Sequence, residues 1–177
     1  PGDAGGVPPD FVWIASENLQ SADGLYPAPH RLSDKAGDTV GYKGGVIFPV
    51  RVVPKDATKP VVLRGKVEYG LCKDICIPVQ AELEVSMPDA MVENPLEKAR
   101  IDAAVAALPQ APDDRFKAVS AAYDPQTDLL HLGLVLPEGE AAPELFIAGP
   151  PGYGFGKPVL TPGDGGALRA DIPVRAP

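Results

Sequence analysis

Proline and glycine interrupt the apolar stretches of this chain throughout its length, and they limit its fold more than any other feature. The 177 residues include 22 Pro and 19 Gly, and 45% of all residues are hydrophobic. That hydrophobic content is enough to build a core. The prolines and glycines form no repeat, so they predict short strands joined by tight turns. We therefore expect an all-β fold.

Segments rich in β-branched and aromatic residues, bounded by Pro, Gly or Asp, mark the expected strands. In the first half of the chain, the strands of a sandwich are expected at Phe11–Trp13, Val46–Val53, Val61–Tyr69 and Ala81–Val85. The polar segment Lys55–Pro60 is expected to link two neighbouring strands as a hairpin would.

One helix is expected to begin at Asn94, which serves as its N-cap. Pro95 then takes the first helical position and Glu97 the capping-box position. Ile101, Val105 and Leu108 fall on one face of this helix, and Pro109 ends it.

A second set of strand-like segments follows the helix. These segments are Phe116–Tyr123, Leu129–Leu136, Leu145–Ala148 and Leu168–Val174. An immunoglobulin-like sandwich has about seven strands, so each half of the chain holds an incomplete set. We expect a β domain over residues 1–90, a helical connector over 91–112 and a second β-rich module over 113–177.

The charge of the chain argues against nucleic acid and anionic membranes as partners. Asp and Glu number 24 against 16 Lys and Arg, a formal net charge of -8, and no basic run could neutralise phosphates. No apolar stretch approaches the roughly 20 residues that span a bilayer. The opening PGDAGGVPPD lacks the basic and apolar regions of a targeting segment. We expect a soluble domain whose signal sequence lies outside this sequence.

Both cysteines lie in the segment VEYGLCKDICIPVQ, as Cys72 and Cys76. A structural zinc site needs four N or S ligands, and His30 and His131 stand far from the pair with no finger-like spacing. Both histidines are expected to be surface or partly packed residues. Two thiolates could still hold copper(I), although we expect no metal and no cofactor.

A disulfide between the cysteines, structural or redox-active, requires the segment to bend. Four residues of straight strand separate Cα atoms by ~13 Å, whereas a disulfide needs them within ~7 Å. A turn or bulge at Lys73–Ile75 is therefore expected if the bond forms. A loop this short constrains the unfolded chain little, which makes stability alone a weak reason for the bond.

A redox pair needs a thiolate that can attack and a neighbour that can resolve the mixed disulfide. Lys73 favours the thiolate of Cys72, and Asp74 opposes it. The three-residue gap is not the two-residue gap of thioredoxin motifs, and no βαβ pattern surrounds it. The residues alone leave the structural, metal-binding and redox interpretations open.

The stretch YGLCKDICIP, preceded by GYKGGVIFPV and PGDAGGVPP, resembles the amino-terminal periplasmic domain of the DsbD family of thiol:disulfide interchange proteins. Within the family it is most similar to ScsB-like and free-standing DsbD-domain proteins, and the likeness covers about residues 1–90. The resemblance implies an immunoglobulin-like sandwich located in the periplasm, with Cys72 and Cys76 as its redox pair. It further implies a protein-disulfide reductase component that takes electrons from a membrane-embedded thiol reductase domain and passes them to oxidised periplasmic thioredoxin-like proteins.

The family shields its disulfide with a cap loop that carries aromatic side chains, and TVGYKGG resembles that loop. The resemblance implies that Tyr42 is the shielding residue, with Val40 beside it. From composition, Ser33–Gly45 is expected to be an exposed loop. Asp38 lies near this cap and could raise the pKa of a thiol, or it is a solvated loop charge.

Tyr153 and Phe155 lie on the Gly-rich stretch GPPGYGFGKP. They are candidates for contact with a partner, with ordinary turn packing as the alternative. A second hypothesis for the whole chain is a non-catalytic immunoglobulin-like interaction module with a structural disulfide, linked to copper tolerance or cytochrome c maturation.

Overall fold

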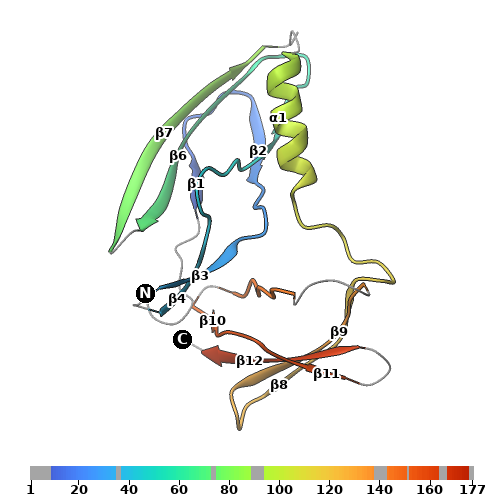
Figure 1. Ribbon diagram of the computed structural model, residues 1–177. Helices are drawn as coiled ribbons and strands as arrows, with labels where there is room; N and C mark the ends of the chain where they lie inside the picture. The colour runs from blue at the N-terminus through green and yellow to red at the C-terminus, as the bar shows by residue number, and fades with distance from the viewer. Residues whose placement is uncertain are drawn as a thin grey trace. The chain divides into compact units, whose positions relative to one another are not determined.

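The computed structural model describes residues 9–34, 37–72, 75–88, 94–137, 143–150, 152–163 and 167–175. In these residues the chain is mainly β-structure with a single helix, which confirms the predicted all-β class (Figure 1). Contacts divide the chain into two compact units, and each is described by itself below. The cysteine unit comprises Gly6–Ala28 and Tyr42–Pro109, and the carboxy-terminal unit includes Pro29–Gly41 and Gln110–Pro177.

The cysteine unit contains two antiparallel sheets. The first has the strand order β1-β6-β7 and the second pairs β2 with β5. Their bounds are Asp10–Trp13 for β1, Leu19–Gly24 for β2, Val50–Pro54 for β5, Val61–Cys72 for β6 and Cys76–Met87 for β7. The long β6–β7 hairpin is the largest element of this unit (Figure 1).

The core of the cysteine unit lies against the first part of β6. Alternate residues Val61, Leu63 and Gly65 are buried, as expected for a strand with one face on a core. Beside them is an aromatic cluster in which Phe11 stacks on Trp13 with ring centroids 5.7 Å apart, and Phe48 meets Phe11 edge-on. These large rings bury much of the apolar area of a small domain.

Asn18 fixes the connection between the two sheets. Its side-chain amide donates to the carbonyls of Asp56 (2.8 Å), Lys59 (2.9 Å) and Pro60 (3.2 Å), and its oxygen accepts from the backbone N–H of Asp56. The prediction that Lys55–Pro60 links neighbouring strands was wrong. It carries the chain from β5, which pairs with β2, to β6, which pairs with β1 and β7.

One strand prediction and one loop prediction before residue 60 need correction. The apolar run from Val46 becomes a strand only at Val50, and Val46 and Ile47 are exposed. The stretch from Ser33 to Gly45, expected to be an exposed loop, contains half of a hairpin between β3 (His30–Asp34) and β4 (Gly37–Gly41). Glycine and charge misled the prediction, because the pairing of β4 with β3 makes it a strand despite its composition.

Helix α1 spans Pro95–Ala106 and begins as predicted. The Asn94 side chain accepts from the backbone N–H of Leu96 (3.1 Å) and of Glu97 (3.4 Å). The predicted apolar face is not the buried one, since Ala104 is buried while Ile101 and Val105 are 55% and 46% exposed. No helix among the described residues is long and apolar enough to cross a membrane.

The carboxy-terminal unit contains a sheet of order β10-β12-β9-β8, with β11 also paired to β12. The bounds are Lys117–Asp124 for β8, Leu129–Val135 for β9, Gly154–Phe155 for β10, Val159–Pro162 for β11 and Leu168–Arg175 for β12. Three of the four strands predicted after the helix are therefore confirmed.

The fourth predicted segment, Leu145–Ala148, is not a strand. Leu145 and Ile147 instead pack against the core that Leu134, Ala170 and Ile172 form. The segment is a continuous apolar run that is half-buried without pairing to a strand among the described residues.

The two histidines are surface or partly packed residues, as predicted. His30 is exposed, and His131 lies half-buried with its Nδ1 2.6 Å from Oδ1 of Asp171. Arg169 Nε donates to the same oxygen at 2.9 Å. The contacts with His131 and Arg169 lower the pKa of the Asp171 carboxyl.

The predicted division at residues 90 and 112 stays a prediction. The contact-defined units place α1 with the cysteine strands and the β3–β4 hairpin with the carboxy-terminal strands.

Gly65 provides a stability test of the β1–β6 packing. A Cβ at this position would lie 2.6 Å from the Trp13 ring and 2.8 Å from the Val12 carbonyl oxygen, and the backbone oxygen cannot easily move away. We expect Gly65→Ala to lower the free energy of unfolding by about 1–3 kcal/mol, the usual cost of overpacking. Urea denaturation measures this change.

The matched control is Gly45→Ala, because a Cβ at Gly45 meets nothing within 4 Å. It should leave the unfolding curve nearly unchanged. Equal unfolding free energies for the two variants would show that β1 does not pack closely on β6.

Candidate redox site

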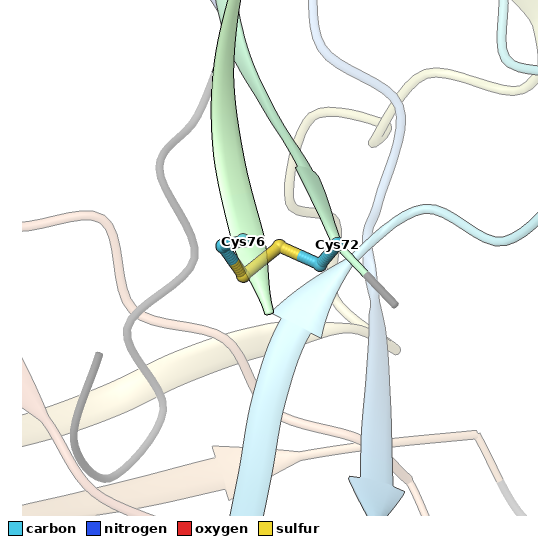
Figure 2. Close-up of a disulfide and its surroundings, with 2 residues drawn as sticks. All are labelled: Cys72 and Cys76. Atoms are coloured by element: carbon cyan, nitrogen blue, oxygen red, sulfur yellow. A yellow bond between two sulfur atoms is a disulfide. The ribbon is translucent and has the colours of Figure 1, made fainter. Parts of the chain in front are cut away.

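The β6–β7 ladder brings the two cysteines together. Its strands pair in unbroken register from Val61 opposite Met87 to Cys72 opposite Cys76. The Cα atoms of the cysteines are 4.0 Å apart, and their sulfur atoms are bonded at 2.03 Å. Figure 2 shows the bond joining the facing ends of the two strands. β6 and β7 run antiparallel, so the chain reverses direction between the cysteines as predicted, although Lys73 and Asp74 of the predicted turn lie outside the described residues.

The disulfide lies at the exposed end of the hairpin. At the other end of β6, Val61 and Leu63 are each only 6% exposed. Around the disulfide, Leu71, Ile77 and Ile75 are 58%, 47% and 75% exposed, and both cysteines are exposed as well. The sulfur atoms are therefore placed where the thiol of another protein can approach them, as exchange requires.

Strand alternation places the sulfur atoms and the apolar residues on opposite faces of the hairpin. Side chains of a strand point alternately to its two faces, so Leu71 and Ile77 share the face of the buried Val61 and Leu63. The disulfide lies on the other face, and its neighbour there is the pair Gly70 and Pro78. Glycine has no side chain and proline a short ring, so neither extends over the sulfur atoms.

The face that carries the disulfide is rich in paired charges and has one acidic group near the sulfur atoms. Arg64 contacts Glu84 at 3.0 Å and Glu17 at 2.8 Å, and Lys66 lies 3.8 Å from Glu82. Closer to the disulfide, the Gln80 amide donates to the Glu68 carboxylate at 3.2 Å.

The predicted modulating residues Lys73 and Asp74 lie outside the described residues. Their effect on the cysteine thiols stays a prediction.

Tyr42, the predicted shielding residue, is half-buried in the cysteine unit. Its hydroxyl donates to the carbonyl of Pro27 at 2.7 Å, and its ring meets Phe48 edge-on with centroids 5.1 Å apart. Burial, followed by the proximity of Tyr26, raises the pKa of the Tyr42 phenol. These contacts fix the position of the ring, while its shielding of the disulfide stays a prediction.

The other two residues assigned to the cap belong to the carboxy-terminal unit. Val40 pairs with Arg31 in the β3–β4 hairpin. Asp38 accepts a hydrogen bond from the Ser33 hydroxyl, and its carboxylate lies 3.9 Å from Lys157. Their roles at the disulfide also stay predictions.

The two aromatic residues predicted to contact a partner lie in different surroundings. Tyr153 is exposed at the turn before β10, whereas Phe155 packs against the core of the carboxy-terminal unit. A contact of either residue with a partner stays a prediction.

Sequence reasoning missed the residues that border the disulfide. Counting outward from the turn would have placed Leu71 opposite Ile77 and Gly70 opposite Pro78, provided that the hairpin was recognised as symmetric about the cysteines. In the described part of the chain, no three His, Cys, Asp or Glu side chains gather as a metal site would require.

Residues 7–88 match the model of the family described as "Thiol:disulfide interchange protein DsbD, N-terminal". These residues belong to that family. The matched range contains the whole β6–β7 hairpin and both cysteines. This DsbD N-terminal domain, with its cysteine pair at bonding distance, is a thiol:disulfide interchange module.

A solved structure extends the likeness over nearly the whole chain. The N-terminal periplasmic domain of ScsB from Proteus mirabilis superimposes with a TM-score of 0.72 at 20% sequence identity, covering 98% of this chain and 67% of that one. This comparison supports the predicted immunoglobulin-like class for the fold. No curated protein matches the sequence.

The position of the disulfide predicts that it contributes little to folding. It closes a loop of only a few residues at an exposed hairpin end, for which chain entropy gives ~2 kcal/mol, less than half the value for a 100-residue loop. We expect the Cys72→Ser, Cys76→Ser double variant to stay folded, with its free energy of unfolding lowered by ~2 kcal/mol or less. Urea denaturation measures this loss.

Reduced wild-type protein is the control, because it loses the same bond without any substitution. If both proteins unfolded in the absence of denaturant, the disulfide would be a structural staple.

Proposed function

We propose that this chain is a periplasmic thiol:disulfide interchange module that relays electrons through Cys72 and Cys76. In this proposal a membrane-embedded thiol reductase domain supplies the electrons, and oxidised periplasmic thioredoxin-like proteins receive them. The observation that carries the proposal is an exposed disulfide at the end of a hairpin, within a domain of the DsbD N-terminal family. The periplasmic location rests on the likeness to a periplasmic domain of ScsB.

The exchange takes place in two displacements, each with its electrons balanced. A thiolate of the reductase attacks one sulfur of the Cys72–Cys76 bond, a mixed disulfide forms, and the other cysteine leaves as a thiolate that takes up a proton. The second thiol of the reductase then attacks the mixed disulfide and releases the first cysteine. Two electrons and two protons have then passed to the module, and the same steps in reverse reduce the acceptor.

The hairpin suits this chemistry because it can open at its end and remain paired elsewhere. Opening the bond frees only the last pair of the ladder, while the core residues of β6 lie at the opposite end of the strand. Regions that move during function generally have few buried contacts. Opening the disulfide therefore leaves the packing that stabilises the fold in place.

The non-catalytic interaction module with a structural disulfide is the alternative that the experiments must separate. Its links to copper tolerance and cytochrome c maturation stay predictions.

The reduction potential of the Cys72–Cys76 pair tests the proposal first. We expect a value within the range of exchange proteins, roughly -120 to -270 mV, because the pair is exposed and closes a short loop. Equilibration in glutathione or dithiothreitol buffers with counting of free thiols measures it. A potential below about -300 mV would instead favour a structural disulfide.

Single cysteine variants then test turnover. Reduced Cys72→Ser and Cys76→Ser each retain one thiol, so one of them should accumulate a mixed disulfide with an oxidised thioredoxin-like protein. The double serine variant is the control for non-specific association. Absence of any mixed disulfide with either single variant would contradict the relay.

Tyr42 tests the proposed shielding of the disulfide. If its ring covers the sulfur atoms, Tyr42→Ala should speed reduction of the disulfide by dithiothreitol, measured under native conditions. Tyr26→Ala is a matched control, because Tyr26 also contacts Phe48 edge-on and donates its hydroxyl to a backbone carbonyl. Equal reduction rates for the two variants would show that Tyr42 does not shield the disulfide.

A further inference from the structure

The sheet face that carries the disulfide extends from the β6–β7 hairpin onto the neighbouring strand β1. Residues directly opposite each other on paired strands share a face, so Asp10 on β1, Glu68 on β6 and Gln80 on β7 form one row across it. All three residues are exposed. We call this the sulfur face, because it ends at the Cys72–Cys76 bond. Strand β1 thus adds a second carboxylate beside the one that Glu68 places on the hairpin.

The row of Asp10 and Glu68 differs in its charge balance from the rows farther from the disulfide. Each of the next two rows contains a basic side chain beside a glutamate: Lys66 with Glu82 at 3.8 Å and Arg64 with Glu84 at 3.0 Å. Among the described residues, neither Asp10 nor Glu68 forms an ion pair, and Glu68 accepts only from the Gln80 amide. The carboxylates nearest the disulfide therefore lack the cations that the more distant ones have.

Asp10 and Glu68 place two negative charges directly opposite each other, an arrangement that lowers the stability of a strand pair. A basic side chain bound between them would offset this repulsion and form charge-assisted hydrogen bonds to both carboxylates. Lys73 and Asp74, which separate the cysteines in the sequence, carry opposite charges and add no net charge. The unbalanced charge beside the disulfide is therefore negative.

The surface between the acidic pair and the disulfide is free of long side chains. Gly70 and Pro78 form the one row of β6 and β7 that lies between them. The four residues from Glu68 to Cys72 span ~13 Å of strand. Even a small redox interface, with about 600 Å² on each partner, is a patch ~28 Å across. A protein whose thiol attacks the disulfide from the sulfur face therefore also covers the acidic pair.

We propose that the exchange partner docks on the sulfur face and places a lysine or arginine between Asp10 and Glu68 while its thiol meets the disulfide. This inference rests on the proposed relay and adds the class of partner, a thiol protein with a basic group about 13 Å from its reactive cysteine. The opposite face of the hairpin end, where Leu71 and Ile77 are exposed, is the alternative docking surface.

Peptide thiols of different charge test the preference for a basic group. Three peptides of sequence Cys-Gly-Ser-Gly-X, acetylated and amidated, with Lys, Gln or Glu as X, carry their charge at the required distance from one thiol. Each thiolate attacks the disulfide of the whole chain, forms a mixed disulfide and frees one protein thiol, which mass spectrometry of acid-quenched samples follows. At about 10 mM ionic strength we expect the Lys peptide to react about two- to fivefold faster than the Gln peptide. The Glu peptide should be the slowest, and about 1 M NaCl should remove the differences.

Substitution of the acidic pair tests its assignment. The Asp10→Asn, Glu68→Gln double variant should bring the three rates together, because it removes both charges and keeps the side-chain shapes. The matched control is the Glu17→Gln, Glu84→Gln double variant, which removes two charges beside Arg64 at the far end of the face and should keep the preference for Lys. All four substituted residues are exposed, so both variants should fold.

The outcomes separate this inference from the relay itself. Equal rates for the three peptides with the wild-type chain, or a preference for Lys that survives in the Asp10→Asn, Glu68→Gln variant, would overturn the docking surface and leave the relay standing. If none of the peptides opened the disulfide, the relay would fail and this inference would fail with it.

Discussion

The register of the β6–β7 ladder is the constraint on which the rest of the cysteine unit depends. Because side chains alternate along a strand, a slip of one residue would turn Val61 and Leu63 out of the core and move the cysteines to the other face. The buried residues at one end of β6 therefore fix the geometry at the other end, where Cys72 meets Cys76 directly. Packing that is remote from the disulfide determines whether the bond can form.

The buried residues that stabilise this unit and the disulfide lie at opposite ends of one pair of strands. Burial of apolar surface contributes roughly 25 cal/mol per Å², and that burial is concentrated around Val61, Leu63 and the rings of Phe11 and Trp13. The last rungs of the ladder bury little, so a change of the bond there alters few contacts. An exchange site placed in the core would instead couple each turnover to repacking.

Sequence reasoning succeeded where a local signal determines a local structure. The Asn94 cap rests on side-chain bonds to the next residues, and the bend between the cysteines follows from the reach of the chain. Sequence reasoning failed where residues far apart in the sequence determine the structure. Asn18 holds the segment after β5 through bonds across about 40 positions, which no short pattern records.

Apolar content was an unreliable strand signal in this chain. Leu145, Phe146 and Ile147 are all half-buried, yet no strand among the described residues completes a ladder there. Conversely, the β3–β4 hairpin pairs residues with little apolar content, such as Ser33 with Asp38. Apolar content indicates burial, whereas strand formation depends on a partner that lies elsewhere in the sequence.

The two faces of the hairpin end differ chemically, because side chains alternate between the two faces of each strand. The sulfur face has Gly70 and Pro78 as its next rung, so access to the disulfide is not restricted by long side chains on that rung. The opposite face keeps Leu71 and Ile77 exposed although they continue the row of core residues. The core ends before the strands do, so the disulfide end of the hairpin stays uncovered. These apolar residues are thus exposed because the ladder extends beyond the core as far as the cysteines.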